Sequence, residues 1–111
     1  MKTFVLLTGS ILAFLCSTAS NAQCEMNESG YANISGEYVC TTYCPGGGVG
    51  KTTYIIQNGG ALSLVNEGGQ TSSGTISLNK VTATGWGITA TVANNCREII
   101  FSNSTVWLRR Y

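Results

Sequence analysis

The residues with the most distinctive chemistry are the glycines, lysine and threonines of GGGVGKTTY, residues 46–54. Glycine-rich loops of this type bind phosphate, because their backbone N–H groups surround it, the lysine contacts its oxygens and a threonine hydroxyl holds magnesium. Such a loop follows a strand, and a helix begins at its lysine and directs free N–H groups at the phosphate. Nucleotide binding therefore depends on the elements around the motif.

Those surroundings argue against a nucleotide. The general pattern G-x-x-x-x-G-K-[ST] needs glycine where this chain has Pro45. The variant loop of plasmid-partitioning ATPases matches residues 47–53, but its preceding lysine is replaced by Gly46. Residues 52–57 alternate like a strand and run into a turn, and no Asp is present to hold magnesium. We interpret the motif as a hairpin loop between the first two strands, with no nucleotide and no cofactor.

The chain also lacks the side chains of common catalytic mechanisms. It contains no His and no Asp, which excludes Ser-His-Asp and Cys-His arrangements. A glycosidase needs two facing carboxylates, and only Glu37, Glu67 and Glu98 lie in or near predicted strands. The composition still allows a catalytic Ser/Lys pair, although no motif surrounds one. We predict a protein that is not an enzyme and has neither catalytic residues nor a metal.

The N-terminus has the pattern of a secretory signal peptide over residues 1–22. Lys2 gives the positive start, Phe4–Leu15 is apolar, and Ser20 and Ala22 are small residues before a cleavage site. The apolar run is shorter than the ~20 residues that span a bilayer. We therefore predict a secreted, extracellular protein, periplasmic in a Gram-negative bacterium, without membrane insertion.

The remaining 89 of the 111 residues suffice for one small domain. We expect a polar N-terminal arm over 23–35, loosely ordered and held by Cys24, and one β domain over 36–111. Five Lys or Arg balance five Glu in this part, so nothing favours binding to nucleic acid.

Four cysteines remain after residue 22: Cys24, Cys40, Cys44 and Cys96. An even number in a short exported chain indicates two disulfides. A zinc site is the alternative, but one C-x3-C, two isolated cysteines and no His do not give the usual ligand spacing. The spacing alone leaves all three connectivities open.

Short alternating segments rich in Thr, Val, Ile and aromatic residues dominate the rest of the chain. The segments expected to be strands are Gly36–Tyr43, Lys51–Gln57, Ala61–Asn66, Gly74–Asn79, Val81–Gly85, Trp86–Val92, Arg97–Ser102 and Thr105–Arg110. Asn and Gly pairs between them favour tight turns at residues 58–60, 67–69 and 103–104, with a further turn at 94–95. The pattern predicts an all-β antiparallel meander of about seven or eight strands, closed or nearly closed as a barrel, or else packed as a sandwich.

Four side chains form the candidate binding surface: Trp86, Trp107, Arg109 and Tyr54. The small neighbours of Trp86 leave its ring room to lie against backbone or ligand. Trp107 alternates with Val106 and Leu108, which places it beside Arg109 as a Trp–Arg surface pair. Core packing of the tryptophans, with Phe101, is the alternative. Clustering of Trp86, Tyr54 and Trp107 on an exposed face would favour a binding module. Burial of both tryptophans would favour a structural role.

Three asparagines lie in N-x-[ST] sequons: Asn27, Asn33 and Asn103. Three is close to the number expected by chance in this composition. In a eukaryotic host the two sites on the arm would be better glycosylation acceptors than Asn103 in its tight turn.

Several motifs together resemble a set of short exported bacterial proteins without an assigned function. They are G-x-Y-x-C-x3-C at 36–44, IQNG at 56–59, L-x-LVNE-x-G at 62–69 and a C-terminal I-x-F-x-[NR]-G-T-V-W-x-R pattern echoed by 99–109. The resemblance covers about residues 36–110 and implies a compact β fold. The set keeps the C-x3-C pair without the other two cysteines. This implies a disulfide between Cys40 and Cys44, which leaves Cys24 to bond Cys96. This chain also departs from the pattern at Ser104, where the set favours glycine.

We therefore expect a secreted, disulfide-stapled β protein that acts as a structural or interaction component of an extracellular matrix or surface. The alternative is a small binding module for a carbohydrate or for a protein target, such as an enzyme that it inhibits. The expected partner is an extracellular protein or carbohydrate.

Calorimetric titration with ATP and magnesium should show no binding, because no helix begins at Lys51 and no Asp is present for magnesium. Lys51→Ala should leave that result unchanged. Micromolar binding that Lys51→Ala abolishes would contradict the interpretation of residues 46–54 as a hairpin loop.

Overall fold

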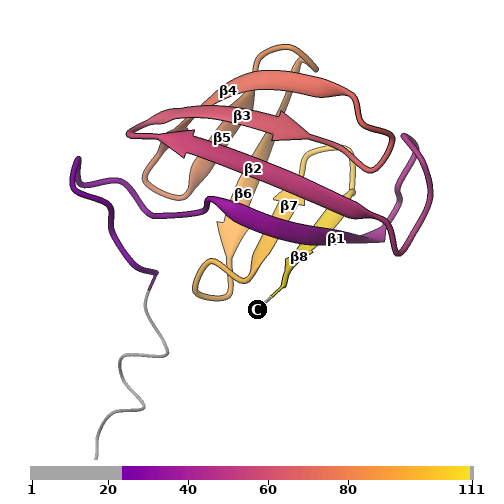
Figure 1. Ribbon diagram of the computed structural model, residues 1–111, viewed down its shortest axis with the longest axis horizontal. Coiled ribbons are helices and arrows are strands. Elements are labelled where there is room, and N and C mark those ends of the chain that lie inside the picture. Colours follow the sequence, from indigo (N-terminus) through magenta and orange to yellow (C-terminus); the bar gives the residue numbers. More distant parts are fainter. Residues whose placement is uncertain (1–23, 111) are drawn as a thin grey trace, which may run out of the picture.

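A computed structural model describes residues 24–110 of the chain (Figure 1). The predicted signal peptide, residues 1–22, lies outside the described residues. Eight strands make up the fold: β1 (Gly36–Thr42), β2 (Thr52–Asn58), β3 (Ala61–Val65), β4 (Thr71–Ser77), β5 (Lys80–Ala83), β6 (Ile88–Ala93), β7 (Glu98–Phe101) and β8 (Val106–Arg109).

The strands form a closed antiparallel barrel, which confirms the predicted all-β meander and selects the barrel over the sandwich. Each strand pairs with the next one in sequence, and β8 returns to pair with β1. A bulge between Cys40 and Thr42 interrupts the β1–β8 ladder. Because β1 and β8 pair with each other, neither strand is left as an unpaired sheet edge.

Side chains alternate between the interior and the outer face of the barrel, as the sequence pattern predicts. In β1, Tyr38 and Cys40 are fully buried, while Val39 points to the other side. The largest buried side chains are Trp107, Tyr38, Ile34, Ile55, Leu64 and Ile99. Eight strands give an interior that side chains can fill.

Most strand boundaries lie within one residue of the sequence-based prediction, and the larger differences are at β4, β5 and β6. β4 begins at Thr71 instead of Gly74, so the β3–β4 connection is a five-residue loop, 66–70, rather than a tight turn. β6 begins at Ile88, which leaves Trp86 in the β5–β6 turn. The β4–β5 turn consists of Leu78 and Asn79, and Leu78 has φ +56° and is 87% exposed. A leucine gives no turn signal, because φ above zero is unusual for it.

The N-terminal arm is packed against the barrel, so the expectation of a loosely ordered arm is wrong for residues 24–35. Met26 and Ala32 form an isolated β-bridge, and Ile34 is 0% exposed within the core cluster. The Gln57 side chain accepts a hydrogen bond from Ile34 N (2.8 Å) and donates one to Ala32 O (2.9 Å). Ile34 thus packs in the core, and the bonds to Gln57 hold the arm at the end of the barrel where β2 ends. Figure 1 shows the arm at this end.

Two disulfides are present, with the connectivity that the resemblance implies. Cys24 bonds Cys96 across 72 residues, with Cα atoms 5.4 Å apart, and Cys40 bonds Cys44, with Cα atoms 6.1 Å apart. The first bridge fixes the arm to the β6–β7 turn, and the second closes the end of β1. Disulfides of this kind persist in oxidising compartments.

Within residues 24–110, no helix is long and apolar enough to cross a membrane.

Removing the Cys24–Cys96 bridge should destabilise the protein more than removing the Cys40–Cys44 bridge. The chain-entropy relation gives about 4 kcal/mol for the long loop and about 2 kcal/mol for the short one. Double Cys→Ala variants of each pair, unfolded in urea, test the order through their free energies of unfolding. Equal losses, or a larger loss for Cys40 and Cys44, would contradict it.

Candidate functional site

A cavity of about 250 Å³ opens at the end of the barrel opposite the arm. In an up-and-down meander alternate turns lie at the same end, and this cavity is bordered by the β1–β2, β3–β4, β5–β6 and β7–β8 connections. In Figure 1 the β1–β2 and β3–β4 connections lie at the right and the arm at the left. The lining residues are Pro45, Gly46, Asn66, Glu67, Gln70, Trp86, Ile88, Phe101, Asn103, Thr105 and Trp107.

Three aromatic rings form the apolar wall of the cavity. The centroids of Phe101 and Trp107 are 4.8 Å apart, and those of Trp86 and Trp107 are 6.4 Å apart with ring planes at 79°. Trp86 is partly exposed, whereas Trp107 is 1% exposed and Phe101 4%. The rings therefore meet edge to face, the arrangement that the aromatic quadrupole favours.

The four predicted binding residues do not share one face. Trp107 is in the core, so the Trp107–Arg109 surface pair does not form. Arg109 instead donates hydrogen bonds to the carbonyl oxygens of Asn33 (3.1 Å) and Ser35 (2.5 Å) in the arm. Tyr54 is 45% exposed on the outer face of β2. Of these residues, Trp86 and Trp107 line the cavity.

The glycines on either side of Trp86 are required by the packing and conformation of the backbone, not by the space that the Trp86 ring occupies. A Cβ at Gly85 would lie 2.8 Å from Ser72 Oγ, and Gly87 has φ +69°. Gly85 N donates a hydrogen bond to that same hydroxyl (2.9 Å). The two glycines thus fix the turn that holds Trp86 at the cavity.

Glu67 places a carboxylate in the cavity wall. Asn66 organises its loop, because Asn66 Oδ1 accepts hydrogen bonds from the backbone N atoms of Gly68 and Gln70 (both 2.9 Å). Glu67 Oε2 accepts a hydrogen bond from Gly46 N (2.7 Å), and the residue is 9% exposed. Among residues 24–110 no Lys or Arg pairs with it, and its Oε1 accepts no hydrogen bond. Among the described residues, the fully buried side-chain atoms without a hydrogen-bond partner are Thr53 Oγ1 and Trp107 Nε1, so Glu67 Oε1 is accessible to solvent or to a ligand.

The glycine-rich loop packs backbone to backbone against the Glu67 loop. It connects β1 to β2 as the sequence analysis predicts, with β2 beginning directly after Lys51. A Cβ at Gly68 would lie 2.2 Å from Gly46 O, and a Cβ at Gly47 would lie 2.7 Å from Glu67 O. Here glycines permit close approach to another turn, the role they have toward phosphate in nucleotide-binding loops.

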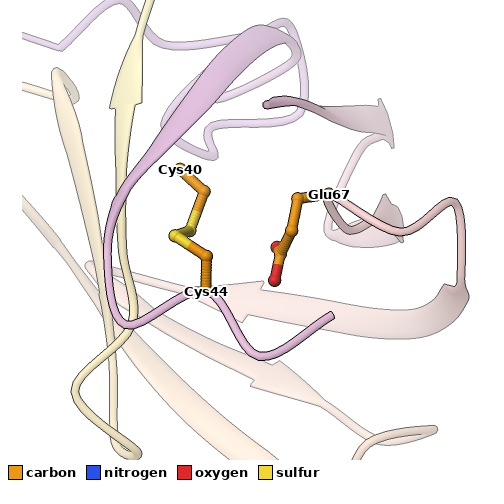
Figure 2. A group of neighbouring side chains, drawn as sticks. All are labelled: Cys40, Cys44 and Glu67. Atoms are coloured by element: carbon orange, nitrogen blue, oxygen red, sulfur yellow. A yellow bond between two sulfur atoms is a disulfide. The ribbon is translucent and has the colours of Figure 1, made fainter. Parts of the chain in front are cut away.

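Figure 2 shows Glu67 beside the Cys40–Cys44 disulfide. The ligand atoms of these three residues lie within 4.8 Å of one another, a spacing that could hold a metal ion. Both sulfurs, however, are joined in the disulfide, whereas zinc binds cysteine as the thiolate. One carboxylate remains as a strong ligand in this group, which is too few for a structural or catalytic zinc site.

The three sequon asparagines hold local turns. Asn27 Oδ1 accepts hydrogen bonds from the N atoms of Ser29 and Tyr31 (both 3.0 Å), and Asn33 Oδ1 accepts one from Ser35 N (3.2 Å). Asn103 Oδ1 accepts one from Thr105 N (3.1 Å) and lies at the cavity. Glycosylation at these sites stays a prediction.

The polar side of the cavity was not found from the sequence, apart from Glu67 as an isolated carboxylate. Asn66 and Gln70 lie in the β3–β4 connection, whereas Asn103 and Thr105 lie in the β7–β8 connection, more than 30 residues farther along the chain. The signal that could have grouped them is the meander itself, since its first, third, fifth and seventh turns must lie at one end.

No protein-family model matches the chain, and neither a curated protein nor a solved structure matches it significantly.

Gly68→Ala should destabilise the protein by about 1–3 kcal/mol, because the added methyl group overlaps the carbonyl of Gly46. Gly69→Ala is the matched control: Gly69 has φ +82° with open space around it, so alanine adds about 1 kcal/mol of backbone strain alone. Urea unfolding of both variants measures the difference. A Gly68→Ala variant as stable as the wild type would refute the contact between the two loops.

Proposed function

We propose that this chain is a secreted, non-enzymatic binding module, and that one small group of an extracellular protein or carbohydrate enters the cavity at the open end of its barrel. The two disulfides fit the oxidising compartment that export would place it in. The N-terminal pattern of residues 1–22 supports export independently.

The observation that carries this proposal is the composition of the cavity wall. Three aromatic rings form one side, and Asn66, Gln70 and Asn103 supply amides beside the Glu67 carboxylate. Ligand sites combine a mostly apolar concave surface with a few polar groups that fix orientation. This cavity combines both.

The volume of the cavity limits the size of the group that can enter it. Sites for drug-sized molecules measure roughly 300–1,000 Å³, and this cavity measures about 250 Å³. One sugar ring or one side chain is therefore the largest group that fits well. The rest of a larger partner would contact the surrounding turns.

The outer face of the barrel favours a second candidate, a structural or interaction component of an extracellular matrix or surface. An apolar stripe, defined as Ile100, Val106, Leu108, Val39, Tyr54 and Ile56, runs across β7, β8, β1 and β2. Ile100 pairs with Val106, and Val39 pairs with Leu108, so these four residues are neighbours on the sheet. Tyr54 and Ile56 continue the stripe on β2, where Tyr54 pairs with Glu37. Ile56 is 63% exposed. Contiguous apolar surface of this kind marks interaction sites.

Arrays of glycans and of extracellular peptides, probed with the purified protein, test the two candidates together. Trp86→Ala should weaken binding to the strongest array ligand by about tenfold or more, because it removes the exposed part of the cavity wall. Leu78→Ala, at the opposite end of the barrel, should leave binding unchanged.

Ile56→Ser provides the comparison for the apolar stripe, and circular dichroism of each variant verifies folding. Loss of binding with Ile56→Ser but not with Trp86→Ala would replace the cavity with the outer face as the site.

A further inference from the structure

We propose that the group bound in the cavity is an alkylammonium cation, held by the Glu67 carboxylate and the rings of Trp86, Phe101 and Trp107. This inference rests on the proposed function and names the chemistry of its ligand. Three properties of the cavity lead to it: its charge, the arrangement of its rings and its size.

The charge of the cavity is negative and uncompensated. Glu67 is the single charged side chain among the eleven residues that line it. The carboxylate is nine-tenths buried, its one hydrogen-bond donor is the backbone of Gly46, and no cationic side chain of residues 24–110 pairs with it. Burying a charge without a counter-charge is costly, and a cationic ligand would supply the missing partner.

The aromatic rings are arranged as adjoining walls. Trp86 lies at 79° to Trp107 and at 60° to Phe101, with centroid distances of 6.4 and 6.5 Å. The three rings contact one another, and each of them lines part of the cavity wall. A cation that lies over the face of a ring, within ~6 Å of its centroid, is attracted by the ring quadrupole, and alkylated ammonium ions are bound by groups of aromatic rings in this way.

Size and chemistry disfavour the other cations. A metal ion requires several strong ligands, and the two sulfurs nearest Glu67 form a disulfide. A guanidinium group prefers to bind carboxylates through two parallel hydrogen bonds to both oxygens, and Oε1 is the oxygen of Glu67 that has no protein donor. A compact ammonium head with methyl groups can contact Oε1 while its methyl groups lie against the aromatic side of the cavity of about 250 Å³.

The same head group occurs in free choline-type solutes, in phosphocholine and in methylated lysine side chains. All three present a trimethylammonium group, and they differ in what is attached to it. Phosphocholine adds a phosphate, which the negative cavity would repel if it came close. A trimethyllysine peptide adds backbone that could contact the surrounding turns.

Isothermal titration with choline and with 3,3-dimethylbutan-1-ol separates charge from shape, because the alcohol replaces the cationic nitrogen by carbon. Choline should bind, and the neutral analogue should bind at least tenfold more weakly. Titrations with phosphocholine and with a trimethyllysine peptide then identify the source, and the tightest of the three trimethylammonium compounds is the closest to the natural ligand.

Glu67→Gln should lower choline affinity at least tenfold. The glutamine keeps an oxygen that can accept the hydrogen bond from Gly46 N, so the loop should remain in place. Glu37→Gln is the matched control, because Glu37 is a half-exposed carboxylate that pairs with Arg110 on the outer surface. It should leave choline affinity unchanged.

Equal binding of choline and its neutral analogue, or unchanged affinity in Glu67→Gln, would overturn the cation proposal. So would the absence of binding by all three cations at 10 mM. A Trp86-dependent array ligand that is a neutral sugar would then leave the binding module intact with a different ligand. If no trimethylammonium compound binds and no array ligand depends on Trp86, the proposed function is refuted as well.

Discussion

The pairing of β8 with β1 is the constraint on which the rest of the structure depends. It closes the meander, satisfies the backbone of the first and last strands and leaves a core that must be filled by inward side chains. Cys40 and Trp107 are direct partners across this seam. The largest core residue and the disulfide beside the cavity are thus held in place by the same pair of strands.

Closure also gives the barrel two different ends. At one end the arm inserts Ile34 and is held by Arg109 and the Cys24–Cys96 bridge. At the other end the connections contact one another through glycines, and the space between them remains a cavity. The polar and aromatic side chains gathered there are the chemically distinctive part of the molecule, because the outer face carries mainly Thr and Ser besides the apolar stripe.

The glycine-rich loop shows how one short motif can satisfy different physical requirements. Glycines at 46–48 resemble a phosphate loop because both need backbone to approach another group closely. Here the approaching group is the Glu67 loop, and the N–H of Gly46 binds a carboxylate of the chain itself. That hydrogen bond fixes one carboxylate oxygen and leaves the other available to a ligand.

The sequence by itself determined the strand pattern, most turn positions and the even set of cysteines, because these follow from local alternation, Asn–Gly turns and composition. Only the tertiary structure decided that Trp107 is core, that Arg109 binds the arm and that Ile34 closes the barrel. Local alternation places Trp107 and Arg109 on the same side of β8 but does not say which side is the interior. The cavity likewise depends on four connections brought together by closure, and no stretch of sequence contains more than a part of it.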